Sequence, residues 1–279
     1  RDRSPSRGLG DVYKRQIVFF CLLLLLTGCK QNTSHSDLAF PGMSPDSVER
    51  CAQDSLFTNT QYSRHLLRQA LSGTSDSLSY YRLLSFYSKS YFVTADFDSI
   101  LYYNQFIKRF CDRVTPSPEV HDLLSTVYNI EGNVLMQRTQ PDSAIISYEK
   151  AYKERLQGKE PDYLPDLCIN LADANVHKGD YTYAAYYYRR ALFLCDSLGL
   201  PDRNKFPVYY GLGQTYMELR DFELSNHYYE LAGAFFDRMS VSEKWTYLNN
   251  RGNHFYYKKD YPQAVCYISR ASVSYTHLR

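Results

Sequence analysis

The chain has 279 residues, of which 44% are hydrophobic and 22% charged, and its formal net charge is +2. The basic excess lies at the ends, because residues 1–16 hold five Lys or Arg against two Asp or Glu and Arg279 adds one more. The rest of the sequence has 26 basic and 28 acidic residues and no basic cluster, so its charge does not support a nucleic-acid-binding function.

The two ends of the sequence do not follow the pattern of the rest. Residues 1–16 (RDRSPSRGLGDVYKRQ) and residues 273–279 (VSYTHLR) resemble translated sequencing-adapter sequence of the kind seen in metagenomic gene predictions. We therefore leave both segments out of the fold argument as non-native. On this interpretation the chain is a fragment of a longer protein.

A short apolar segment follows. Residues 17–26 (IVFFCLLLLL) are ten apolar residues, about half of what a bilayer-spanning helix needs and the usual length of a signal-peptide core. Residues 26–29 (LTGC) come next and resemble the lipobox of bacterial lipoproteins. The resemblance implies a signal segment over residues 17–29 and a lipid anchor on Cys29, held stably by two or more acyl chains. An ordinary secretory signal with an incidental cysteine is the alternative.

Residues 30–45 predict a flexible tether between the anchor and a folded domain. They are polar, rich in Ser, Asn and Pro, and have no helical period. They lack the acidic run that accompanies surface export in Bacteroidota-like lipoproteins. By this analogy we expect a bacterial cell-envelope protein whose domain faces the periplasm.

Residues 46–272 predict about eleven or twelve helices and no strand. Helix starts are indicated by serine followed by proline or by a capping glutamate, and helix ends by glycine followed by proline. The starts are Ser44-Pro45-Asp46, Ser117-Pro118-Glu119 and Ser240 with Glu243, and the ends are Gly158 with Pro161 and Gly199 with Pro201.

One pattern recurs four times in this region. A small residue in one helix precedes a polar turn, and the next helix then carries a small residue, a large residue and an alanine. The first small residue is Gly132, Ala172, Gly213 or Gly252, at spacings of 40, 41 and 39. The second-helix sets are Ala144, Tyr148 and Ala151; Ala184, Tyr188 and Ala191; Ser225, Tyr229 and Ala232; and Ala264, Ile268 and Ala271. A weaker copy has Leu84, Ser88, Tyr91, Phe97, Ile100 and Asn104.

This pattern resembles the tetratricopeptide repeat (TPR), a helix–turn–helix unit with a usual period of about 34 residues. The resemblance implies an all-α solenoid, a right-handed superhelix of about five or six repeats with a period near 40, in which each repeat covers its neighbour's apolar face. Residues 62–71 are expected in a divergent capping repeat. Tyr148, Tyr188 and Tyr229 are expected in the core. An unrelated helical bundle is the alternative, which four copies in register argue against.

In the TPR family, ligands lie along the concave wall formed by the first helices. The resemblance implies ligand contacts at the fifth, ninth, twelfth and thirteenth positions of each repeat. These are Asn129, Asn133, Met136 and Gln137; Ile169, Asp173, Val176 and His177; Tyr210, Gln214, Met217 and Glu218; and Asn249, Asn253, Tyr256 and Tyr257. The ninth position is polar throughout, which suits the backbone of an extended peptide, flanked by Met and Tyr for apolar side chains. A wall that is polar only because it meets solvent is an equal alternative.

The sixth position argues against one kind of ligand. Some TPR domains place Lys or Arg there to clamp a C-terminal carboxylate. Here the sixth position holds Ile130, Asn170, Gly211 and Asn250. A clamp of that kind is therefore not expected.

Catalytic and metal-binding motifs are missing from the sequence. It has no HExxH, phosphate loop or GxSxG. Asp166 and Asp173 lie seven residues apart on one helix face, which suits a solvated face as well as an acid/base pair. The lone histidines His177, His227 and His254 are more typical of surface or cap positions than of ligands. Cys51, Cys111, Cys168, Cys195 and Cys266 lack a CxxC spacing and are expected as buried small side chains. We predict no enzyme, cofactor or metal in this part of the chain.

The lipobox and the long-period, Tyr-rich repeats together resemble the N-terminal half of Bacteroidota regulators. In those proteins a transmembrane helix and a DNA-binding or histidine-kinase module follow the repeats. The resemblance implies a non-catalytic, membrane-anchored scaffold that binds a peptide or protein, with no nucleic acid bound by this part. The alternatives are a free-standing TPR lipoprotein in outer-membrane assembly or ligand capture, and an enzyme encoded downstream.

Overall fold

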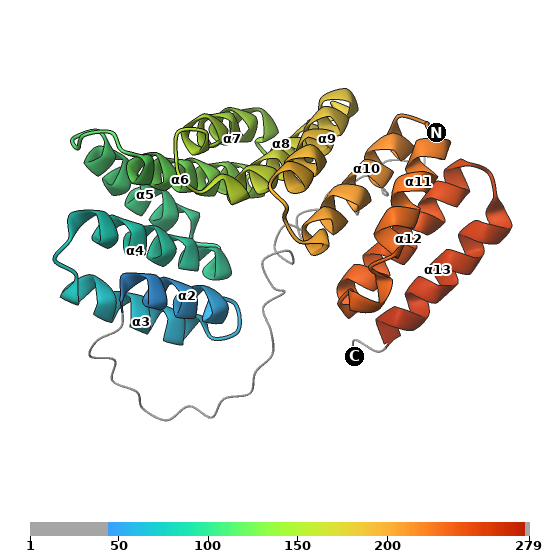
Figure 1. The fold of residues 1–279 in the computed structure, drawn as a ribbon. Helices are drawn as coiled ribbons and strands as arrows, with labels where there is room; N and C mark the ends of the chain where they lie inside the picture. Colours follow the sequence, from blue (N-terminus) through green and yellow to red (C-terminus); the bar gives the residue numbers. More distant parts are fainter. Residues whose placement is uncertain (1–43, 277–279) are drawn as a thin grey trace, which may run out of the picture. The chain divides into compact units, whose positions relative to one another are not determined.

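The computed structural model describes residues 44–276, which hold twelve α-helices, four short 3-10 helices and no strand (Figure 1). The sequence prediction of eleven or twelve helices without strands is confirmed for this range. The expected signal segment, Cys29 and residues 30–43 of the expected tether lie outside the described residues. The chain divides between Lys159 and Glu160 into two compact units, and each described unit contains three helical hairpins.

In unit 1 the hairpins follow one another along the sequence (Figure 1). The helices are α2 (Pro45–Ser55) with α3 (Thr60–Gly73), α4 (Ser77–Lys89) with α5 (Phe97–Cys111), and α6 (Pro118–Gln137) with α7 (Pro141–Arg155). The 3-10 helix η1 (Ser90–Thr94) joins α4 to α5. The first helices contact one another in turn, α2 with α4 and α4 with α6.

Unit 2 repeats the arrangement. Its hairpins are α8 (Leu164–Lys178) with α9 (Tyr181–Ser197), α10 (Phe206–Glu218) with α11 (Phe222–Gly233), and α12 (Val241–Tyr257) with α13 (Tyr261–Thr276). Short 3-10 helices η2 (Pro161–Tyr163), η3 (Asp202–Lys205) and η4 (Phe236–Arg238) precede the three first helices. Among these first helices, α10 contacts both α8 and α12. Helix α13 continues four residues past the predicted boundary at residue 272.

The predicted helix starts are confirmed. Ser44 and Ser117 each cap a helix whose first turn contains a proline, and Ser240 with Glu243 forms a capping box with both hydrogen bonds present. These side chains satisfy backbone N–H groups that have no partner inside the helix. The structure therefore begins these helices where local chemistry favours it.

The turns within the last four hairpins share one backbone conformation. Their left-handed residues are Thr139, Gly179, Arg220 and Lys259, with φ of 57°, 88°, 63° and 68°. An aspartate follows in three of the four turns and caps the next helix. Only one of the four turn residues is glycine, which is why glycine spacing by itself does not reveal this turn.

The small positions of the repeat are packed against the large ones. A Cβ atom at Gly213 would lie 2.9 Å from the Tyr229 ring, and one at Gly132 would clash with the Tyr148 ring. Tyr148, Tyr188 and Tyr229 expose 2%, 4% and 0% of their surface, so their predicted core position is confirmed. The missing side chain lets the two helices approach closely enough for the ring to fill the space between them.

The weaker copy of the repeat forms the α4–α5 hairpin, but the residues at its small and large positions, Ser88 and Asn104, are both polar. The Ser88 hydroxyl lies 3.2 Å from both Asn104 Oδ1 and the Ile100 carbonyl oxygen. Asn104 is fully buried and donates through Nδ2 to the Val127 carbonyl at 3.4 Å. A buried amide therefore takes the place of the tyrosine ring in this hairpin.

The cysteine expectation is confirmed at three positions and wrong at one. Cys111, Cys168 and Cys195 are buried, and burial raises their pKa values to about 12, 12 and 11. Cys266 is exposed on α13, and Cys51 is half-buried. None of these five forms a disulfide in the described structure. Helix α13 has no following helix over it within the described residues, which is why Cys266 meets solvent.

One further property concerns membranes. Within residues 44–276, no helix combines the length and the apolar character required to cross a bilayer.

Candidate functional site

The expected ligand positions on α6 are all half-buried. They are Asn129, Asn133, Met136 and Gln137. Asn133 is also tied to the core, because its Oδ1 accepts a hydrogen bond of 2.7 Å from the Tyr148 hydroxyl. The bond uses the amide oxygen and leaves the NH₂ group as the donor that Asn133 could offer to a ligand.

The same arrangement recurs on α8. Asp173 is half-buried, and one of its carboxylate oxygens accepts a hydrogen bond from the Tyr188 hydroxyl. His177, one turn further along, is half-buried as well. Val176 is half-buried and Ile169 is buried. Asp173 and His177 are thus the polar groups that α8 brings to this face.

Helix α10 differs from the expectation. The sequence predicted accessible contacts at Tyr210, Gln214 and Met217, and the structure buries all three, at 7%, 9% and 1% exposure. The reason is the position of α10 in the array, where it lies between α8 and α12. The Tyr210 hydroxyl instead accepts a hydrogen bond from the Asn250 side chain of α12.

The end of α10 carries a charged group beside aromatic rings. Glu218 is half-buried, and burial raises the pKa of its carboxyl while the Arg220 charge opposes this. Burial and the nearby charges of Glu218 and Tyr257 raise the pKa of Tyr181. The Arg220 guanidinium lies 4.7 Å from the centroid of the Tyr257 ring, within cation–π range.

Helix α12 offers the most accessible part of the expected wall. Asn249 and Asn253 are half-buried, while Tyr256 and Tyr257 expose 57% and 41% of their surface. The Tyr256 ring also packs edge-to-face against Tyr261, with centroids 5.9 Å apart. Rigid rings beside amides provide both apolar and hydrogen-bonding contact area.

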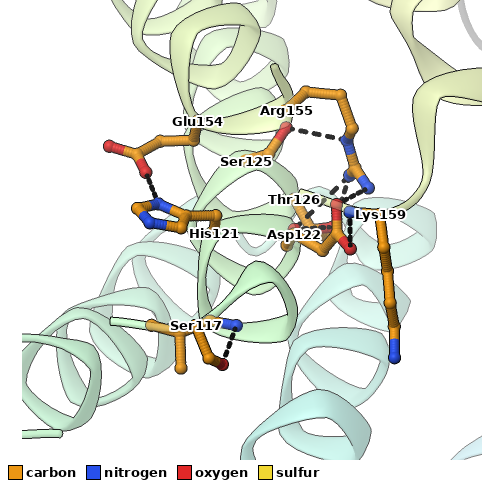
Figure 2. A network of polar contacts seen from close by, with 9 residues as sticks. Ser117, His121, Asp122, Ser125, Thr126, Glu154, Arg155 and Lys159 are labelled. Carbon is orange, nitrogen blue, oxygen red and sulfur yellow. Dashed lines mark hydrogen bonds and ion pairs between the residues drawn. The ribbon is translucent and has the colours of Figure 1, made fainter. Parts of the chain in front are cut away.

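A buried ion pair in unit 1 was not foreseen (Figure 2). Arg155 Nη1 lies 2.8 Å from Asp122 Oδ1, and the two side chains are 5% and 10% exposed. Arg155 also donates to Ser125 and Thr126, and the Lys159 backbone N–H donates to the other Asp122 oxygen at 3.0 Å. These contacts join α6 to the end of α7 and the turn that follows.

The packing around this ion pair is tight. A Cβ atom at Gly158 would collide with the Asp122 carboxylate, so the glycine is required for the turn to approach it. On the other side of the hairpin, His121 Nδ1 lies 2.7 Å from Glu154 Oε2 (Figure 2). The sequence did not predict the Asp122–Arg155 pair, because an acidic and a basic residue in successive helices look the same in a sequence whether they are buried together or both exposed.

His254 corrects the interpretation of the lone histidines. It is fully buried on α12, and its Nδ1 lies 2.8 Å from the Ser225 hydroxyl. Ser225 donates its single proton to the Gly213 carbonyl at 2.8 Å, so it must accept from His254, which places the proton on Nδ1. Burial, together with the Arg251 and Lys258 charges, lowers the pKa of His254 to about 4. His227 is exposed, as a surface histidine should be.

Metal binding has no candidate in the described chain. Among residues 44–276, no three or more His, Cys, Asp or Glu side chains are grouped so that they could hold a metal ion.

Comparison with known proteins places these hairpins in a common architecture. A family model described as the tetratricopeptide repeat matches residues 206–232, which cover α10 and most of α11. The search of curated proteins found no match to this sequence.

Solved structures share the fold at low sequence identity. BtubC (BKLC) from P. vanneervenii is 18% identical with a TM-score of 0.62, covering 85% of this chain and 93% of that protein. A STAND protein from Pyrococcus horikoshii with a TPR sensor, PH0952, is 17% identical with a TM-score of 0.59, covering 83% of this chain and 32% of that one. Pseudomonas aeruginosa pilF is 15% identical with a TM-score of 0.57, covering 80% and 88%. The described chain is therefore an all-α array of tetratricopeptide-type repeats.

Proposed function

We propose that this protein is a non-catalytic scaffold that binds an extended peptide or protein segment along the first helices of its hairpins. The observation that carries the proposal is in unit 2, where α10 contacts both α8 and α12. Consecutive first helices therefore adjoin, and their accessible side chains can serve one ligand. We call these side chains the first-helix strip: Asp173, His177, Glu218, Asn249, Asn253, Tyr256 and Tyr257.

The chemistry of the first-helix strip suits a peptide backbone. Asn249 and Asn253 each carry a donor and an acceptor, which match the alternating C=O and N–H groups of an extended chain. Tyr256 and Tyr257 add rigid rings for apolar side chains of the ligand. In unit 1, the half-buried α6 residues Asn129 and Gln137 would act in the same way, with Asn133 contributing its NH₂ group.

Selection of peptides from a random library on the full chain tests this proposal. The selected peptide should bind at least about tenfold more weakly to Tyr256→Ala, as expected when an aromatic anchor is lost. Tyr102→Ala on α5 is a matched control, because Tyr102 and Tyr256 are both 57% exposed. Failure to select any peptide, or equal affinity for the two variants, would contradict binding at the first-helix strip.

The second part of the proposal is the location. We propose that Cys29 carries a lipid and that the array faces the periplasm of a bacterial envelope. Metabolic labelling with radioactive palmitate should mark the wild-type chain in a Gram-negative host and leave Cys29→Ser unlabelled. Equal labelling of both would remove Cys29 as the anchor.

Within that setting, we propose that the array is the sensory part of a signalling regulator. The precedent is PH0952, in which the TPR region is described as a sensor. The alternative is a free-standing lipoprotein of outer-membrane assembly or ligand capture. Sequencing the source locus past codon 272 separates them, because a transmembrane segment with a helix-turn-helix or kinase module supports the first and an early stop codon supports the second.

A further inference from the structure

The outer face of α9 exposes an unusual number of aromatic rings. Tyr183, Tyr186 and Phe193 are 59%, 48% and 69% exposed. With Arg190 they follow a spacing of three, four and three residues, which places them in one line along the helix. Arg189 is exposed beside this line. We call these five residues the α9 stripe.

The charge of the α9 stripe has one sign. From Thr182 to Cys195 the helix contains two arginines and no acidic residue. Asp180 precedes the helix as its cap, and Asp196 at its end forms an ion pair of 2.7 Å with Lys205. Over this range α9 itself therefore contributes only positive charge beside the exposed rings of the stripe.

A related pattern occurs on two second helices of unit 1. Each exposes large apolar side chains interleaved with basic ones. They are Ile146, Lys150 and Lys153 on α7 with Leu156 directly after its end, and Tyr102, Phe106 and Arg109 on α5. On α5 the acidic residue near the helix start, Asp98, is paired with Arg138 at 2.6 Å. Helix α7 also carries Glu149 beside Lys150, so its exposed face is mixed in charge and only α5 resembles the α9 stripe in sign.

Helix α11 shows that this chemistry is not general to second helices. Its exposed apolar residue, Leu224, is 39% exposed. It follows Glu223 directly, and Glu230 is also exposed on the same helix. Such a face is acidic and typical of contact with water.

We propose that the α9 stripe rests on the surface of an anionic lipid membrane. Tyrosine and phenylalanine rings insert at the boundary between headgroups and acyl chains, with the phenol hydroxyl at headgroup level. Arginine pairs with lipid phosphate, and anionic lipids supply the opposite charge. A lipid surface satisfies these residues without the shape complementarity that a protein partner would need. The inference adds to the proposed envelope location and is independent of acylation at Cys29.

The test places a fluorescent reporter in the α9 stripe of the full chain. Trp245 is the single tryptophan, so Trp245→Phe gives a dark background into which Phe193→Trp is introduced. Vesicles of phosphatidylglycerol and phosphatidylcholine with brominated acyl chains should quench this tryptophan and shift its emission to the blue. Leu224→Trp in the same background is the control and should stay unquenched. Circular dichroism confirms that both variants are folded.

The role of charge is tested separately. Arg189→Gln should weaken binding to the anionic vesicles about fivefold. Vesicles of phosphatidylcholine only should quench the position-193 reporter much less.

Three results would overturn the inference. The first is a reporter at position 193 that stays unquenched although the chain sediments with the vesicles. A stripe that binds a protein instead of lipid would give this result, and the proposed lipid anchor at Cys29 would be unaffected by it. The second is equal quenching at positions 193 and 224, which indicates unspecific association. The third is no vesicle binding at all.

Discussion

The Tyr148 hydroxyl donates a hydrogen bond of 2.7 Å to Asn133 Oδ1, fifteen residues earlier in the chain. Tyr188 and Asp173 are bonded across the same separation in the next hairpin. In the first case the ring also lies where a side chain on Gly132 would be. The repeat therefore combines a close helix contact with a polar tie, and the residues expected to meet a ligand also hold the hairpin together.

Removing this tie should destabilise the hairpin. Tyr148→Phe keeps the buried ring and loses the hydroxyl, so we expect a loss of about 0.5–1.5 kcal/mol in the free energy of unfolding. Urea titration measures it. Tyr102→Phe, at an exposed tyrosine, should change nothing. A double-mutant cycle with Asn133→Ala isolates the bond, and additive effects would show that it contributes nothing.

A methyl group at the small position should also be costly. Gly132→Ala would place its Cβ against the Tyr148 ring, and we expect overpacking to cost about 1–3 kcal/mol. Gly73→Ala, where no atom lies within 4 Å of the added carbon, should be neutral or stabilising by up to about 1 kcal/mol because alanine favours the helix. If both variants melt at the wild-type temperature, the packing described for Gly132 is wrong.

The buried ion pair should respond strongly to loss of one partner. Asp122→Ala leaves the Arg155 guanidinium buried without its carboxylate, and we expect a loss of about 3–5 kcal/mol. Asp98→Ala removes a carboxylate that is 93% exposed and should cost about 0–1 kcal/mol. The double variant Asp122→Leu with Arg155→Met should recover part of the loss. A double variant less stable than Asp122→Ala would contradict this account.

His254 should make unit 2 sensitive to acid. Its folded pKa of about 4 lies below its usual value near 6.5, so the unfolded chain binds the proton more readily. The neutral, buried imidazole contributes its full stabilisation of the folded chain above about pH 7.5, and this contribution is lost as the pH falls from about 6.5 to 4. Protonation of His254 should therefore lower the free energy of unfolding by about 2 kcal/mol between pH 7.5 and pH 5.

Urea unfolding at the two pH values, followed by Trp245 fluorescence, measures the loss on the same helix. His254→Gln should flatten the pH dependence, whereas His227→Gln at an exposed histidine should leave it as in the wild type. An unchanged slope in His254→Gln would mean that the histidine does not couple folding to protonation.

The sequence determined the repeat and its register. Gly132 and Tyr148 belong to a pattern that recurs at nearly constant spacing, and helix contacts must recur with it. Ser117 and Ser240 signalled helix starts because capping involves residues only three positions apart. These features are local or periodic, so a single chain displays them without reference to its neighbours.

Only the tertiary structure decided which side chains meet solvent. Met217 and His254 were expected at accessible positions and are buried, because burial on α10 and α12 depends on the helices stacked beside them. Asp122 and Arg155 pair because the end of one helix reaches the start of another across 33 residues. The periodic pattern fixes which face of a helix turns inward. How closely adjacent hairpins approach, and which side chains reach across, follows from packing that has no period in the sequence.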